Sequence, residues 1–191
     1  MSTLKLAAKH VLRNMGLMKN PSVVYSRHMA LNNTYTLDPE AALIIDSAEV
    51  IGGYLDDPFR TVVKLNDGLK VPFKVGVHKA VGGDHDYPNP GDILCASLAS
   101  CMESTTKMIA NRFNIKLLKT VVKVSALVDV RGTLRIDLNV PVAFQSMHVE
   151  YQVEAKGLSQ KELKKFFGAI KKSCVIYQTL KKAIPIKIDI I

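Results

Sequence analysis

Residues 82–114 read GGDHDYPNPGDILCASLASCMESTTKMIANRFN, and this stretch decides the fold. The glycine pair and the prolines after it predict a loop. Asn89, with Asp92 three residues later, forms a capping-box pattern, and Pro90 suits the first turn of a helix. Apolar residues then recur at three- and four-residue spacing to about Asn114. The stretch therefore predicts a long, largely buried helix that carries Cys95 and Cys101.

Strand patterns lie on both sides of this helix. Residues 60–77 alternate apolar and polar side chains around Asn66-Asp67-Gly68, a turn sequence that favours a β-hairpin. Three later stretches, residues 119–130, 133–140 and 147–155, also carry Val, Ile or Leu at every second position. We expect each of them to form a strand.

A second long helix follows these strands. Ser159 and Glu162 form its capping box, Cys174 lies midway along its apolar stripe, and Pro185 ends it. Residues 184–191 then predict a last strand. This order of elements indicates an α+β fold with helices packed on an antiparallel sheet. The first helix is so apolar that it needs covering on both sides, for example by a second subunit.

The first 57 residues are expected to be an N-terminal helical extension, and residues 58–191 the main domain. Residues 1–20 have a basic amphipathic helical pattern, and we favour a docking helix over an organelle-targeting or membrane-surface helix. Asp38 and Pro39 predict a short helix or turn that leads into a strand. No apolar run approaches the roughly 20 residues that span a bilayer. We therefore expect a soluble, cytoplasmic protein without a membrane partner.

The chain has a net charge of +9, and many of its lysines fall within residues 161–182. Helical periodicity there indicates a solvated helix face. Because no aromatic residues interleave with these lysines in a groove-like pattern, the sequence does not favour nucleic-acid binding.

Three widely spaced cysteines, Cys95, Cys101 and Cys174, do not form the even framework of a small secreted protein, so we expect reduced thiols. Cys95 and Cys101 lie about 240° apart around the helix and cannot face one pocket. Each thiol could be a small core side chain or a reactive group. No CxxC or HxxxH spacing is present, and His78 and His85 are better explained by a surface loop. The sequence thus predicts neither a metal site nor a cofactor.

Two segments resemble the OsmC/Ohr family (osmotically inducible protein C and organic hydroperoxide resistance protein). They are GGDHDYPNPGDILCASLASC, which begins at Gly82, and KKSCVIYQTLKKAIPIKIDI, which begins at Lys171. The resemblance runs from about Arg60 to Ile191. It implies an intertwined homodimer in which an antiparallel sheet wraps two long helices, with the active sites at the subunit interface.

The resemblance also implies an antioxidant, peroxiredoxin-like chemistry. Cys101 would be the peroxidatic cysteine that attacks an organic hydroperoxide and becomes a sulfenic acid, and Cys174 would be the resolving cysteine that closes a disulfide. A lipoyl-type dithiol would then reduce that disulfide.

The sequence departs from the family pattern at one position. Hydroperoxide-reducing members carry a glutamate after the helix-opening proline, and here that residue is Gly91. Asp92 could substitute for it, although the capping box also uses Asp92, and Arg60 is the candidate for the arginine that pairs with the carboxylate. The alternative hypothesis is therefore a non-catalytic relative that binds a small apolar ligand at the dimer interface.

Overall fold

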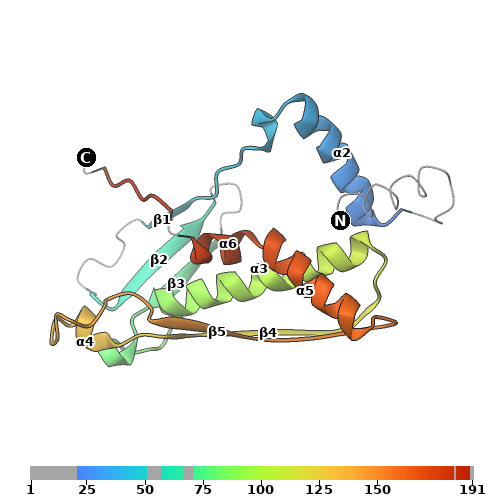
Figure 1. Ribbon diagram of the computed structural model, residues 1–191. Helices are drawn as coiled ribbons and strands as arrows, with labels where there is room; N and C mark the ends of the chain where they lie inside the picture. The colour runs from blue at the N-terminus through green and yellow to red at the C-terminus, as the bar shows by residue number, and fades with distance from the viewer. Residues whose placement is uncertain (1–20, 51–56, 67–70, 183, 190–191) are drawn as a thin grey trace.

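The computed structural model describes residues 21–50, 57–66, 71–182 and 184–189 (Figure 1). The helix predicted at residues 1–20 lies outside these ranges. The described elements are α2 (Val23–Leu37), η1 (Glu40–Ala42), β1 (Ala48–Val50), β2 (Arg60–Leu65), β3 (Val71–Gly76), η2 (Lys79–Val81), α3 (Pro90–Arg112), β4 (Leu117–Leu127), α4 (Val130–Thr133), β5 (Ser146–Ala155), α5 (Gln160–Ser173) and α6 (Val175–Lys181).

The strands form two antiparallel sheets, in the orders β1-β2-β3 and β4-β5. Arg60 of β2 lies opposite Gly76 of β3, and Leu65 lies opposite Val71, so the predicted hairpin is confirmed. β4 and β5 form a long two-stranded ribbon in which Leu127 pairs with Ser146. The prediction of an α+β fold with antiparallel sheets is correct.

Helix α3 begins where its cap residues predict. The Asn89 side chain accepts hydrogen bonds from the Gly91 and Asp92 amides, and the Asp92 carboxylate accepts one from the Asn89 amide, so both halves of the capping box are present. This arrangement satisfies amide groups that the first helical turn leaves without partners. The predicted start of the helix is therefore confirmed.

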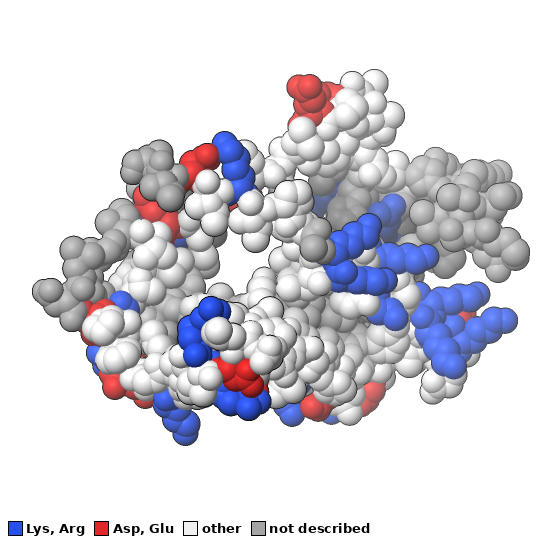
Figure 2. Space-filling view, turned by 60° about the vertical axis from the view of Figure 1, so that its left-hand side comes forward, with Lys and Arg blue, Asp and Glu red and all other residues white. Residues whose placement is uncertain are grey.

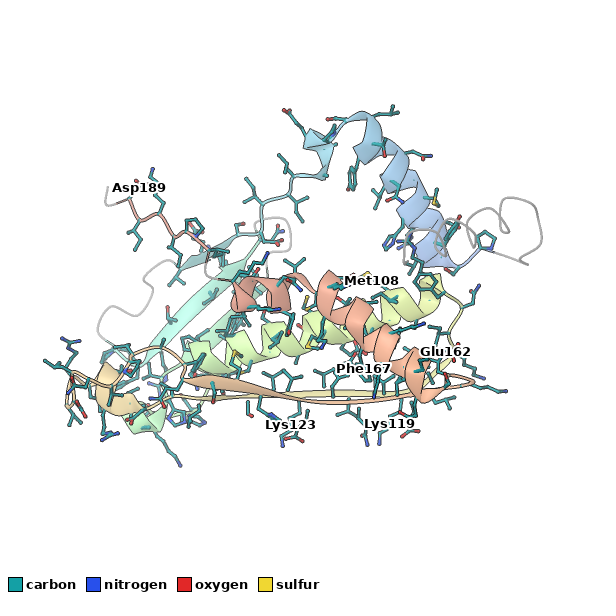
Figure 3. All side chains as sticks on the ribbon, in the orientation of Figure 1. Met108, Lys119, Lys123, Glu162, Phe167 and Asp189 are labelled. Carbon is teal, nitrogen blue, oxygen red and sulfur yellow. The ribbon has the colours of Figure 1, made fainter. Side chains whose placement is uncertain are left out.

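The core lies between α3, the β4-β5 ribbon and α5. Its buried apolar residues are Leu98, Met102, Ala110, Phe166, Ile170 and Cys174. In Figure 3, Phe167 points from α5 toward the ribbon, whereas Lys119 and Lys123 point away from it on the opposite face. The alternation of side chains along β4 thus separates a core face from an exposed face, which carries lysines together with the apolar Val121 and Leu127.

Three predicted elements are wrong. Residues 133–140 form no strand: the chain enters the short helix α4, Arg135 has a φ of 59°, and Asp137 accepts hydrogen bonds in a local turn. The second long helix breaks at Cys174 into α5 and α6. Residues 184–189 have no strand pairing within the described part of the chain.

The stretch before the hairpin contains one element that the sequence did not single out. Residues 23–37 form α2, which lies against the C-terminal end of α3. β1 follows the turn at Asp38 and adds a strand to the hairpin, as the sequence predicted. The turn predicted at Asp38 is present, because its carboxylate accepts hydrogen bonds from the Glu40 and Ala41 amides.

The surface agrees with the expected solvated lysine face. Figure 2 shows basic side chains gathered on one side of the molecule, and the lysines of α5 are all exposed. None of the described helices is long and apolar enough to cross a bilayer.

Candidate functional site

Cys101 and Cys174 lie side by side at the junction of three helices. Cys101 comes from the middle of α3, and Cys174 lies at the break between α5 and α6. The Cys174 thiol donates toward the Cys101 sulfur, and the two Sγ atoms are 3.0 Å apart. A shift of about 1 Å would bring them to covalent distance. The structure therefore places two thiols that are 73 residues apart in the sequence within reach of one disulfide.

The environments of the two thiols differ. Cys174 has no solvent exposure, whereas Cys101 is partly exposed. Burial, and then the hydrogen bond to Cys101, raise the pKa of the Cys174 thiol to about 11. At neutral pH Cys174 therefore holds its proton. Of the two residues, Cys101 is the more exposed.

The break in the helix fixes the position of Cys174. Its amide donates to the Ile170 carbonyl and ends α5, while its sulfur accepts a hydrogen bond from the Tyr177 amide, with 3.5 Å from N to Sγ, and caps α6. One residue thus serves as the last cap of one helix and the first cap of the next. In a continuous helix, the Tyr177 amide would donate to a backbone carbonyl, and the Cys174 sulfur would cap no helix.

An aromatic and hydroxyl cluster closes the core side of the thiol pair. The Tyr151 hydroxyl is hydrogen-bonded to Thr106, and its ring packs edge-on against Phe167 with centroids 5.0 Å apart. Burial raises the pKa of Tyr151, and the nearby Glu103 carboxylate and Cys174 raise it further. Tyr151 therefore keeps its hydroxyl proton near neutral pH. The sequence analysis missed this residue because its contact with α3 is non-local.

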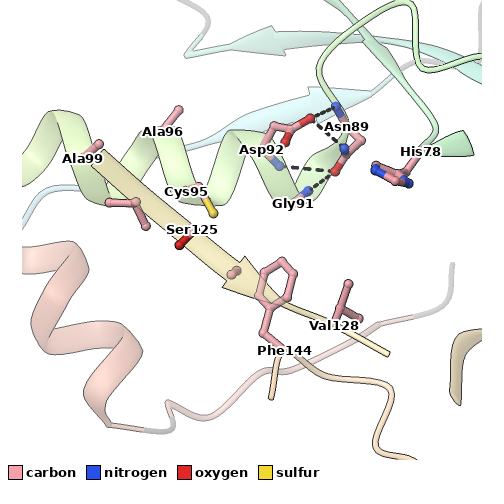
Figure 4. Close-up of a pocket in the computed structure, with 12 residues that line it drawn as sticks. His78, Asn89, Gly91, Asp92, Cys95, Ala96, Ala99, Ser125, Val128 and Phe144 are labelled. Carbon is pink, nitrogen blue, oxygen red and sulfur yellow. Dashed lines mark hydrogen bonds between the residues drawn. The ribbon is translucent and has the colours of Figure 1, made fainter. Parts of the chain in front are cut away.

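Cys95 lies on another face of α3 and does not join the pair. It lines a cavity of about 490 Å³ between the N-terminal half of α3, the end of β4 and Phe144 (Figure 4). Burial, and then the Asp92 carboxylate, raise the pKa of its thiol. A protonated thiol is a poor nucleophile. The expectation that Cys95 and Cys101 face different surroundings is confirmed.

Gly91 has a specific neighbour that the sequence analysis did not foresee. A Cβ atom built at Gly91 would lie 3.1 Å from Cζ of Phe144 and 2.9 Å from Oδ1 of Asn89. In Figure 4 the Phe144 ring lies beside the first turn of α3, where Gly91 is located. The aromatic ring and the cap therefore occupy the space that a side chain at position 91 would need.

The two supporting candidates are held by local interactions. The Asp92 carboxylate accepts from both the amide and the side-chain nitrogen of Asn89, at 3.0 and 2.6 Å. It also precedes Cys101 by nine residues, which is about 13 Å along a helix axis. Within one chain, this carboxylate cannot contact the Cys101 sulfur.

Arg60 forms ion pairs with three carboxylates: Asp57 at 2.8 Å, Asp84 at 2.7 Å and Asp86 at 3.1 Å. These partners, chiefly Asp57 and Asp86, raise the pKa of the guanidinium. The structure thus brings Cys101 and Cys174 together, but it keeps Asp92 and Arg60 in contacts of their own.

The described residues contain no group of three or more His, Cys, Asp or Glu side chains placed to hold a metal ion. His78 and His85 instead pack edge-on with ring centroids 4.4 Å apart, and His78 caps η2 through its Nδ1.

The family model and the solved structures that match this chain indicate the same fold. A family model described as OsmC-like protein matches residues 83–189. No curated protein matches the sequence.

Solved structures with the same fold include an OsmC-like protein from Mycoplasma pneumoniae, with a TM-score of 0.58 and 13% identity over 73% of this chain and 89% of that one. An OsmC-like protein of unknown function from Vibrio cholerae has a TM-score of 0.57 and 14% identity over 72% of this chain and 94% of that one. An organic hydroperoxide resistance protein from Elizabethkingia anophelis has a TM-score of 0.54 and 21% identity over 74% of this chain and 91% of that one. At these identities the likeness concerns the fold alone.

Proposed function

This chain belongs to the OsmC-like protein family, and from that premise we propose that it is a thiol-dependent peroxidase that reduces organic hydroperoxides. The observation that carries the proposal is the 3.0 Å separation between the sulfurs of Cys101 and Cys174. The partly exposed Cys101 is the peroxidatic cysteine, and the buried Cys174 is the resolving cysteine.

The reaction proceeds in two steps. The Cys101 thiol first releases its proton to solvent, and the thiolate attacks the peroxide oxygen that bears hydrogen. The O–O bond breaks, Cys101 becomes a sulfenic acid, and the leaving alkoxide takes a proton from solvent to form the alcohol. The Cys174 sulfur then attacks the Cys101 sulfur, the S–O bond breaks, and water leaves with the proton of Cys174. The hydroperoxide gains two electrons and the pair of thiols loses them. A lipoyl-type dithiol returns both electrons by thiol–disulfide exchange.

We propose that the protein works as an intertwined homodimer. Leu118, Val121 and Leu127 of β4 are 60%, 45% and 59% exposed, which leaves apolar surface for a second copy to cover. Because Asp92 lies about 13 Å along α3 from Cys101 in its own chain, any contribution to the site comes from the other subunit. The widely spaced thiols fit a reducing compartment, so we propose a cytoplasmic location.

Thiol counting tests this proposal. One equivalent of an alkyl hydroperoxide is expected to remove two thiols per chain from the wild-type protein and from the matched control Cys95→Ser, whose sulfur lies outside the pair. Cys101→Ser is expected to lose none. Cys174→Ser is expected to lose one and to react with a sulfenic-acid reagent. Unchanged thiols in the wild type would refute the proposal.

A second function is favoured by the cavity at the first turn of α3. This cavity of about 490 Å³ has a size typical of small-molecule sites. Its apolar lining includes Ala96, Ala99, Val124, Val128 and Phe144, and its polar lining consists of His78, Asn89, Asp92 and Ser125. Gly91 supplies no carboxylate there, and Arg60 is occupied by three aspartates. The alternative proposal is a non-catalytic protein that binds a small apolar ligand. Mass spectrometry that finds a co-purified apolar molecule, together with an absence of hydroperoxide turnover, would favour it.

A further inference from the structure

Residues 23–50, here called the arm, contact the described body of the molecule near both of their ends. At the first end, the Val24 amide donates to the Asn111 side chain at 3.1 Å, and His28 lies 3.4 Å from the Arg112 guanidinium. At the other end, β1 pairs with β2. Between these anchors the chain stands away from the body as an arch (Figure 1). The arm is therefore held in place but not buried.

The middle of the arm exposes an unusual apolar run. Leu43, Ile44 and Ile45 are 80%, 78% and 91% exposed, and α2 contains no buried residue. Three consecutive aliphatic side chains in water are unfavourable, because burial of apolar surface is the main stabilising term of folding. Since the arm is anchored at both ends, this run is presented at a defined place. Such a presentation is typical of a contact surface.

The charge of the arm distinguishes between possible partners. Residues 38–50 contain four acidic residues and no lysine or arginine, whereas the whole chain has a net charge of +9. The acidic residues flank the apolar run, so an anionic lipid surface would repel it. A second copy of this chain is basic, and the exposed lysines of α5 offer opposite charge. The partner that fits both the apolar and the acidic character is therefore another copy of the same chain.

We propose that the arm is a clasp between subunits, in which Leu43, Ile44 and Ile45 pack on a second copy of this chain. This inference rests on the homodimer of the proposed function and goes beyond it. It assigns a role to a segment that precedes the family match at residues 83–189. The clasp stabilises the dimer and takes no part in the thiol chemistry.

The test compares two double variants of the full-length protein by sedimentation equilibrium. Ile44→Asp with Ile45→Asp removes the apolar contact. Asn32→Asp with Asn33→Asp adds the same two charges at exposed positions of α2 and serves as the matched control. We expect the dimer dissociation constant to rise at least about 100-fold for the isoleucine pair and less than about 3-fold for the control. Equal dissociation constants, or a monomeric wild type, would overturn the clasp.

A photo-crosslinking amino acid at position 44 keeps the inference testable if the charged variant misfolds. The expected product is a covalent bond between two chains, identified by mass spectrometry of mixed light and heavy protein. Crosslinks only within one chain would show that the arm folds onto its own body, and this would also overturn the clasp. Hydroperoxide-dependent thiol loss, measured on the same samples, reports on the proposed function separately.

Discussion

Replacing Gly91 with glutamate tests whether Phe144 has taken the space that a side chain at position 91 would need. A Cβ atom there would lie 3.1 Å from the Phe144 ring and 2.9 Å from Oδ1 of the Asn89 cap. Overpacking of this kind typically costs about 1–3 kcal/mol. Two other effects oppose this cost. A residue other than glycine gains about 0.5–1 kcal/mol in a helix, and a carboxylate near the helix N-terminus gains about 0.3–1 kcal/mol.

A double-mutant cycle separates the clash from these gains. Gly91→Glu is introduced into the wild type and into Phe144→Ala, and the free energy of unfolding is measured by urea titration at one fixed protomer concentration. Helix propensity and the dipole term act in both backgrounds and cancel. We expect Gly91→Glu to be less favourable by about 1–3 kcal/mol when Phe144 is present. A coupling energy below about 0.5 kcal/mol would refute the reasoning, since independent sites are additive within that range.

Three further predictions follow from the same contacts. The folded state raises the pKa of Cys174 to about 11, so the stability that its neutral thiol contributes is complete below about pH 9 and is lost as the pH rises through 11. Compared with Cys174→Ala, the wild type should lose about 2 kcal/mol of unfolding free energy between pH 8 and pH 11, and parallel pH profiles would contradict this. Tyr151→Phe removes the hydrogen bond to Thr106, whose hydroxyl keeps its bond to the Met102 carbonyl. Urea denaturation should show a decrease of about 0.5–1.5 kcal/mol in the free energy of unfolding, and no decrease would show that the Tyr151–Thr106 contact is not stabilising. Ser159→Ala removes the cap of α5 and should cost about 1 kcal/mol in the same assay, whereas the exposed Ser100→Ala, which caps no helix, should cost less.

The parts of the fold that were predicted correctly depend on local sequence. The capping boxes at Asn89 and Ser159 fixed the start of each long helix, because the residues involved lie within one turn. The β2-β3 hairpin was likewise apparent from its alternation and its turn residues. The interactions that determine each of these features join residues that are close together in the sequence.

The incorrect predictions concern positions whose backbone conformation depends on contacts with distant parts of the chain. Residues 133–140 alternate like a strand, yet the described chain offers them no partner strand, and local turns at Arg135 and Asp137 form instead. No glycine or proline marks the helix break at Cys174 in the sequence, because the Cys174 side chain itself caps α6.

For the site, the family resemblance identified the two cysteines, and the structure brings their sulfurs into contact. Nothing in the sequence linked Phe144 to Gly91 or Tyr151 to Thr106. These pairs are 53 and 45 residues apart, and only the folded chain joins them. Asp92 and Arg60 remain predictions as supporting residues of a site shared between subunits.

The double use of the Cys174 sulfur affects what this residue can reveal about evolution. Since the sulfur also caps α6, loss of Cys174 would damage folding even in a protein that no longer turned over any substrate. A cysteine here could therefore persist in lineages that have abandoned the reaction. Cys101 caps no helix and packs against the core, where another small apolar side chain could replace it in a relative that has lost its chemistry. In a survey of related sequences, position 101 is therefore the better indicator of activity.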